Sequence, residues 1–428
     1  MRRIAAAPAA LLLAVSVVSS ACSQAGPSGG GDMELAAANV PRASADPSAA
    51  QAAAHAINAF GLVLLANAAA PNANVVVSPA SVVLALAMAR AGARGETAAQ
   101  IDEVLRDVAS DEHADWLNAL DAALATRTAT FKDANGDDQP VTLRIANAPF
   151  GQRGMTLEPA YLEALASRFG AGLRLVDYQA ATEQARQAIN GWVAGQTEQR
   201  IRELLAQGTL DAMTRLVLVN AIYLKAAWQT PFFPDATKPA PFRLADRSTV
   251  DVPTMHLSEG LPYAEGSGWR AVELPYVGGS LAMDVIVPDD MAGFERSLTG
   301  DSLAAVFDAL AWSQVNLSMP KFSIETQAEL SSILARLGMR DAFDSTKADF
   351  SGITHQEQLY ISAVIHQANI DVDEKGTEAA AATAVVMRAT GAPAQPVELT
   401  IDHPFLFALR DLPTGAVLFL GRVADPST

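Results

Sequence analysis

Residues 371–396 read DVDEKGTEAAAATAVVMRATGAPAQP, a composition that an ordinary globular domain does not need. The alanine run Glu378–Ala384 favours a helix by propensity, but it is shorter than the roughly 12 residues that an isolated helix needs. The run also has no large apolar stripe that would dock a helix. Read with a period of two, the same side chains separate into two sets, as they do in a β-strand.

The two faces of this predicted strand differ in character. Both charged residues, Glu378 and Arg388, lie on one face, whereas the other face begins small and becomes apolar: Thr377, Ala379, Ala381, Thr383, Val385, Met387 and Ala389. Such a strand can slide into the middle of a sheet, because no charge on its leading end has to be desolvated. Gly376 supplies a backbone hinge before it. The alternative is a disordered surface loop rich in Ala and Pro.

The rest of the body alternates between predicted strands and predicted helices. Period-two and short apolar runs predict strands at Thr142–Phe150, Thr214–Leu224, Leu281–Val287 and Val315–Met319. Helical patterns cover Gln184–Leu205 and Thr326–Leu337. No fixed-period repeat and no second linker interrupts residues 51–428. We therefore expect one α+β domain over that range.

Composition excludes several classes of function. The chain has 428 residues with 30 Lys and Arg against 47 Asp and Glu, so its net charge of −17 would repel a nucleic-acid backbone. The single cysteine excludes a thiolate zinc cage and a CxxC redox pair. No GxSxG, GxxxxGK or HExxH motif occurs, and no two histidines have the spacing of helical metal ligands. We expect no enzyme activity, no cofactor and no metal.

The N-terminus has the pattern of an export signal. Residues 1–21 join Arg2 and Arg3 to an apolar run that ends in small residues, and Cys22 follows at the position that a bacterial lipoprotein signal lipidates. Ordinary cleavage after Ala21 competes with lipidation, because Ser19 stands where such signals usually have an aliphatic residue. Residues 22–50 are rich in Gly, Ser, Pro and Ala and predict a flexible tether. The body is therefore expected outside the cytoplasm, extracellular or periplasmic, with the membrane reached only through a lipidated N-terminus.

Several motifs together resemble those of one known family. Residues 374–383, EKGTEAAAAT, resemble the hinge of the serpin reactive loop. Five further segments resemble serpin signatures in the family's order: Asn74–Ser81, Gly92–Thr97, Ile145–Ala148, Leu218–Lys225 with Trp228, and His403–Phe407. The match covers nearly the whole body, so the sequence is identified as a member of this family, in a bacterial and exported form.

The resemblance implies a fold and a mechanism. Serpins have three β-sheets with surrounding helices and an exposed reactive loop, here about residues 374–396, that inserts into the central sheet. A target serine protease cuts the loop, forms its acyl-enzyme and is trapped as the loop inserts. The driving force is a metastable native state. The alternative is a non-inhibitory serpin that serves as a carrier or chaperone, whose loop would be cut as a simple substrate.

The resemblance also assigns roles to residues. Ser78, Ser81, Asn220 and His366 would form a polar cluster where the sheet must open, and Trp228 would lie where the loop enters the sheet. The hinge positions are Glu374, Gly376, Thr377, Ala379, Ala381 and Thr383. Because Thr377 would face the core, Thr377→Arg should leave the fold intact and turn the inhibitor into a substrate.

The scissile bond follows from counting along the loop as the family does. Counting forward from Gly376 puts it between Thr390 and Gly391, whereas counting backward from Pro404 reaches Pro393. A shifted register would present Arg388 to a trypsin-like protease, or Met387 to a chymotrypsin-like or elastase-like one. Small residues around Thr390 favour elastase-like or subtilisin-like targets, and papain-like cysteine proteases are a further candidate class. The inhibitor itself is expected to be a monomer.

Overall fold

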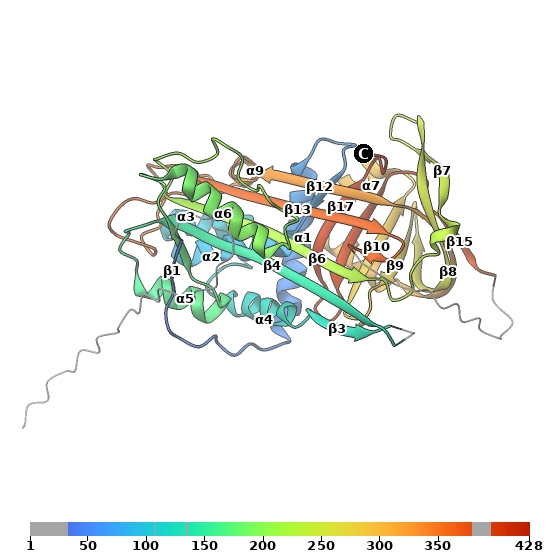
Figure 1. Ribbon diagram of the computed structural model, residues 1–428, viewed down its shortest axis with the longest axis horizontal. Helices are drawn as coiled ribbons and strands as arrows, with labels where there is room; N and C mark the ends of the chain where they lie inside the picture. Colours follow the sequence, from blue (N-terminus) through green and yellow to red (C-terminus); the bar gives the residue numbers. More distant parts are fainter. Residues whose placement is uncertain (1–32, 107, 134–135, 379–394) are drawn as a thin grey trace, which may run out of the picture.

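The computed structural model describes residues 33–106, 108–133, 136–378 and 395–428. Within these ranges the expected α+β architecture is observed: a long sheet crosses the molecule, helices cover both of its faces, and a second sheet lies at one end (Figure 1). The end with the second sheet also holds residues 376–377 and 397–400, the described strands nearest to the undescribed residues 379–394.

The first sheet has the strand order β1-β5-β4-β6-β14-β13-β12, with β3 paired to β4. Strands β6 and β13 are its centre, and they pair with each other in parallel. The bounds are β1 Glu34–Ala36, β3 Ala129–Lys132, β4 Asp138–Gln152, β5 Leu173–Val176, β6 Leu216–Ala227, β12 Phe322–Glu329, β13 Ala363–Asp373 and β14 Gly376–Thr377.

The second sheet has the order β15-β11-β8-β9-β10-β16-β17-β2, with β7 paired to β8. Strands β10 and β17 of this sheet are buried along their whole length, which is typical of strands covered on both faces, although β10 carries Asp284 and β17 carries Arg422. The bounds are β2 Val75–Val77, β7 Lys238–Arg243, β8 Thr249–Gly266, β9 Trp269–Pro275, β10 Leu281–Pro288, β11 Ala311–Pro320, β15 Val397–Thr400, β16 Phe405–Asp411 and β17 Ala416–Val423.

Hydrogen bonding joins the described strands into two sheets where three were expected. The reason is the 18-residue strand β8. Residues 254–263 of β8 pair with β11, and its last four residues, 263–266, pair with β9. One strand thus belongs to two sheet regions and connects them.

Nine α-helices lie within the described residues. Helices α1 and α2 contact β17, and α2 also contacts β4 and β6 from one face of the first sheet, whereas α6 covers the other face (Figure 1). The bounds are α1 Ala49–Ala68, α2 Pro79–Gly92, α3 Gly95–Val104, α4 Ala114–Ala125, α5 Pro159–Phe169, α6 Thr182–Gln196, α7 Met291–Ser297, α8 Gly300–Asp308 and α9 Ser331–Leu337, with short 3-10 turns at Pro234–Ala236 and Asp341–Phe343. Helix α1 is long and apolar enough to cross a membrane, but its apolar face is buried in this core.

Two predicted helices have different bounds. The helix predicted to reach Leu205 ends at Gln196, because the Thr197 hydroxyl bonds the carbonyl of Val193 and accepts from the Ile201 amide, which turns the chain away. The helix predicted from Thr326 is wrong up to residue 329: this segment belongs to β12, whose residues alternate between buried and exposed. The helical part begins only at Ser331.

The segment predicted as a tether also differs where it is described. From residue 33 onward it lies on the body, because β1 pairs with β5 at the sheet edge. Arg42 donates from Nε to the Asn118 side chain at 2.8 Å and forms an ion pair of 2.6 Å with Asp121. Side-chain contacts of this kind are invisible to composition, and they extend the packed body N-terminally beyond residue 51.

Candidate functional site

The described part of the hinge, residues 374–378, contains a two-residue strand that lies inside the first sheet. Gly376 and Thr377 form β14, which pairs with Ala227 and Ala226 of β6 on one side and with the end of β13 on the other. Strands β6 and β13 are therefore separated at this point, whereas Val217–Ile222 of β6 pair directly with residues 363–368 of β13. We call the line between β6 and β13 the seam.

Gly376 is required by the close approach of β14 to β6. Its φ of 151° lies in a region that residues with a side chain rarely adopt. A Cβ atom at this position would also lie 2.1 Å from the backbone oxygen of Ala226. The glycine thus allows the chain to leave β13, turn, and start the inserted strand.

Thr377 points into the core beside an aromatic pair. It is 1% exposed, and its hydroxyl bonds the Tyr276 hydroxyl at 2.6 Å. Tyr276 stacks on Trp228 with ring centroids 4.5 Å apart. The Trp228 indole N–H donates to the Asp373 carbonyl, and its backbone N–H donates to the Lys375 carbonyl, both at 2.9 Å. Trp228 is thus buried and lies against the start of the hinge.

Charged residues hold the two ends of the hinge. Glu374 accepts from Lys321 Nζ at 2.9 Å and from the Thr237 hydroxyl at 2.8 Å. Burial opposes ionisation of Glu374, but these hydrogen bonds lower its pKa below the usual value. At the C-terminal end of the described hinge, Glu378 accepts a hydrogen bond from Arg200 Nε at 2.7 Å. Arg200 also forms an ion pair with Asp371.

A polar cluster lies beneath the directly paired part of the seam. The structure brings together Ser78, Ser81, Asn220 and His366, the residues to which the serpin resemblance assigns such a cluster. Ser78 caps α2, with Pro79 at the first helical position, and its backbone N–H donates to His366 Nε2 at 3.1 Å. Asn220 Nδ2 donates to Ser81 Oγ at 2.5 Å, and Asn220 Oδ1 bonds His366 Nδ1.

The protonation of His366 follows from these contacts. Since Nε2 accepts a hydrogen bond from a backbone amide, the proton of the neutral ring is on Nδ1 and is donated to Asn220. Complete burial disfavours the charged ring and lowers the pKa of His366 to about 3. The cluster is therefore uncharged at neutral pH, and each strand that it joins can separate without desolvating an ion.

Asn147 is a fifth member of the polar cluster that the sequence did not assign. Register places it opposite Asn220, which is itself opposite His366, so three neighbouring strands present one row of polar side chains. Asn147 accepts from Asn220 at 2.6 Å and from Ser81 at 2.9 Å, and it donates to the Ser81 carbonyl. In the sequence, the signal for this role was the amide side chain of Asn147 between Ala146 and Ala148 in a predicted strand.

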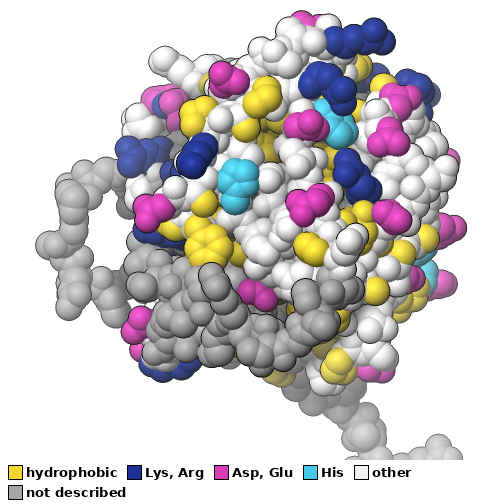
Figure 2. All heavy atoms as spheres, turned by 90° about the vertical axis from the view of Figure 1, so that its right-hand side faces the viewer, with side chains coloured by type: hydrophobic (Ala, Val, Ile, Leu, Met, Phe, Trp, Pro, Cys, Tyr) yellow, Lys and Arg dark blue, Asp and Glu magenta, His cyan; other side chains and the backbone are white. Residues whose placement is uncertain are grey.

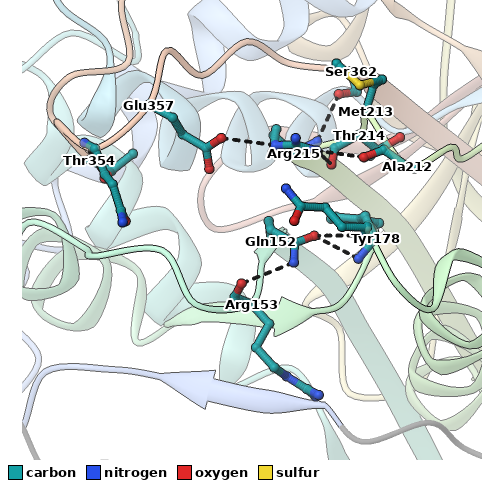
Figure 3. A network of polar contacts seen from close by, with 12 residues as sticks. Gln152, Arg153, Tyr178, Ala212, Met213, Thr214, Arg215, Thr354, Glu357 and Ser362 are labelled. Carbon is teal, nitrogen blue, oxygen red and sulfur yellow. Dashed lines mark hydrogen bonds and ion pairs between the residues drawn. The ribbon is translucent and has the colours of Figure 1, made fainter.

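A second connection closes the seam at the end far from the hinge. Arg215, just before β6, donates from Nε to Glu357 at 3.1 Å, and its backbone N–H donates to the Ser362 hydroxyl (Figure 3). The Ser362 amide in turn donates to the Leu216 carbonyl at 2.9 Å. Arg215, Glu357 and Ser362, here named the clasp, thus tie the start of β6 to the chain that enters β13.

The remaining predicted site residues lie outside the described residues. They are Cys22, Ala379, Ala381, Thr383, Met387, Arg388, Thr390 and Gly391. The described residues hold no group of three or more His, Cys, Asp or Glu side chains that could bind a metal ion.

Comparison with known proteins identifies the family. The family model Serpin (serine protease inhibitor) matches residues 55–426. The leukocyte elastase inhibitors of Equus caballus and Homo sapiens are each 40% identical to this chain, covering 83% of it and 94% of the relative. The crystal structure of the thermophilic serpin tengpin in its native state superposes with a TM-score of 0.78 at 27% identity, covering 90% of this chain and 96% of tengpin.

Members of this family inhibit proteases and are not themselves catalysts. The inserted start of the hinge, the seam with its polar cluster and the match over residues 55–426 lead to one conclusion: the chain belongs to the serpin family of serine protease inhibitors.

Proposed function

We propose that this protein is a suicide-type inhibitor that traps a serine endopeptidase by inserting its cleaved loop along the seam. The observation that carries the proposal is Thr377, which lies buried between β6 and β13 in the uncleaved chain. A strand that continues in this direction would replace the direct β6–β13 pairing residue by residue. It would also pass over the uncharged polar cluster.

The chemistry of trapping belongs to the target. The hydroxyl of its active-site serine attacks the carbonyl carbon of the scissile bond, which we place at Thr390 with Gly391 as the leaving amine. The amine takes a proton and departs, and an ester joins Thr390 to the protease. Water would hydrolyse this ester in an ordinary substrate. Insertion of residues 379–390 must therefore be faster than that hydrolysis.

The target class is proposed from the residues beside the bond. Thr390 and Gly391 are small, which suits an elastase-like or subtilisin-like cleft, and the relatives named leukocyte elastase inhibitors support the first of these. Cleavage after Arg388 would indicate a trypsin-like target, and cleavage after Met387 a chymotrypsin-like or elastase-like one.

The decisive experiment incubates the full chain with leukocyte elastase, subtilisin and trypsin and separates the products on denaturing gels. We expect a covalent complex that resists boiling in detergent. We also expect a released C-terminal fragment whose mass corresponds to a chain that begins at Gly391. Cleavage in the loop without a complex, and without a gain in thermal stability, would contradict the proposal and favour the carrier or chaperone function.

Export and lipidation at Cys22 form a separate proposal, supported by the residues on either side of it. Expression with a radiolabelled fatty acid tests it. We expect label and detergent-phase partitioning for the natural chain and neither for Cys22→Ser. An unlabelled natural chain that is cleaved after Ala21 would instead indicate ordinary secretion.

A further inference from the structure

A small apolar hollow lies between the two stems from which residues 379–394 extend. Its volume is about 30 Å³, and its lining includes Trp228, Leu261, Pro275 and Trp312. Trp228 contacts the N-terminal stem, because its backbone N–H donates to Lys375. The C-terminal stem is β15, which pairs in parallel with β11, the strand that carries Trp312. The hollow is therefore framed by both ends of the loop.

Trp312 is the most exposed large hydrophobic side chain among the described residues. It is 70% exposed, and the other exposed large hydrophobic side chains in the described ranges are Met213 at 65% and Leu35 at 43%. Its ring lies over Gly260, where an added Cβ would be 3.9 Å from the indole. Since the side chain buries little area, it contributes little to the stability of its own fold. Tryptophan of this kind is enriched at the energetic centres of protein interfaces.

The position of Trp312 on β11 places it on the loop side of the C-terminal stem. Strand β15 begins at Val397 opposite Val315, and it runs parallel to β11. Residues 312–314 of β11 therefore extend beyond the start of β15, and no described strand pairs with that edge of them. Figure 2 shows this end of the molecule, on which hydrophobic side chains lie among charges of both signs.

We propose that Trp312 and the hollow beside it form a second contact surface for the body of the target serine protease, separate from the bait residues. The inference rests on the proposed function. A protease whose cleft holds residues of the loop must approach the end of the molecule from which both stems extend. The rim of its cleft then meets the surface between those stems. An apolar side chain on that rim would cover the indole and fill the hollow.

The test measures docking and trapping separately. Binding of elastase whose active-site serine is replaced by alanine reports docking, and the association rate constant and stoichiometry with active elastase report trapping. We expect Trp312→Ala to weaken binding and to slow association about tenfold, which is the effect of losing one interface anchor, with unchanged stoichiometry. Trp312→Phe should retain most of the affinity, and all variants should melt at the same temperature.

Met213→Ala is the matched control. Met213 is similarly exposed, but it lies just before the first residue of β6, whereas Trp228 beside the hollow follows the last residue of β6. Met213 is therefore far along β6 from the proposed contact surface. Its binding should equal that of the natural chain. The contact surface would be overturned if Trp312→Ala bound inactivated elastase as tightly as the natural chain does. It would also be overturned if no variant bound inactivated elastase, subtilisin or trypsin. Docking that depends on Trp312 without a covalent complex would instead overturn only the trapping proposal. A dimer that dissociates on Trp312→Ala would identify a second copy as the occupant.

Discussion

The two ends of the seam are built differently. At the hinge end, β14 separates β6 from β13, and the buried contacts there are a threonine, a tyrosine and a tryptophan. Toward the other end, six consecutive residue pairs join β6 directly to β13, with the polar cluster beneath and the clasp beyond. The native chain thus contains an open and a closed form of the same strand pair.

For the proposed insertion, this difference locates the barrier. The first two residues of the inserted strand are in place before any bond is cut, so the remaining cost lies in separating the closed end. That end is held by ladder hydrogen bonds and neutral side-chain hydrogen bonds, which a new strand can replace one by one. In the proposed mechanism the loop would supply the replacement strand, and its leading side chains are small.

The largest expected effect comes from a charge at the open end. Thr377→Arg would place a guanidinium where the native side chain is 1% exposed, a change that costs several kcal/mol unless β14 leaves the seam. We expect loop cleavage with no detectable covalent complex on gels. Thr400→Arg, on the exposed face of β15, is the control and should trap normally. Trapping by Thr377→Arg at the natural level would refute insertion at this point.

At the closed end, His366 predicts a pH dependence of stability. Its pKa is about 3 in the fold and 6.5 in the unfolded chain, so between these values only the unfolded state binds a proton. Stability therefore falls as pH decreases from 6.5, by at most about 1.4 kcal/mol per pH unit. Urea unfolding between pH 6 and 4 measures this slope.

Comparison with His366→Gln isolates the contribution of His366 to the pH dependence of the unfolding free energy. Glu273 has the opposite influence, because burial raises its pKa to about 7 and the folded state then gains the proton first. The difference in unfolding free energy between the natural chain and His366→Gln cancels this contribution. A difference that does not change with pH would show that His366 is charged or exposed in the folded protein.

Loosening the clasp should have a moderate effect. Arg215 and Glu357 are partly exposed, so their ion pair contributes on the order of 0.5 kcal/mol. In the Arg215→Met variant, the uncut loop should insert about two to three times faster on mild heating. The rate at which trapping activity is lost measures this insertion. Lys132→Met, which removes an exposed pair away from the seam, is the control. A slower loss in Arg215→Met would mean that the clasp promotes insertion.

The smallest effect is expected at Glu378, whose side chain is 9% exposed and pairs with the more exposed Arg200. Glu378→Gln removes the charge that faces Arg200, although Arg200 keeps Asp371 as a partner. The amide of Thr377 should then exchange with deuterium about twofold faster, because β14 leaves the seam slightly more often. Mass spectrometry of peptides covering residues 371–378 measures the exchange. Exchange equal to that of the natural chain would show that Arg200 does not hold β14 in place.

The sequence by itself determined the family, the hinge and the identity of most of the polar cluster. These features are local: the alternation predicted for Thr377–Met387 uses only the strand period, and the motifs around Ser78 and Asn220 are contiguous. The sequence also indicated which hinge face is free of charge. Local patterns carry such information because each depends on neighbours within a few residues.

Only the tertiary structure decided that β14 lies between β6 and β13 and what holds the seam. Tyr276 lies about a hundred residues from Thr377, Asn147 is opposite Asn220 through strand register, and Arg215 meets Glu357 from another loop. The packing of residues 33–50 and the extension of β8 through two sheet regions likewise depend on distant partners. These contacts exist because folding brings remote backbone edges together, and no periodicity within one segment encodes which edge it will meet.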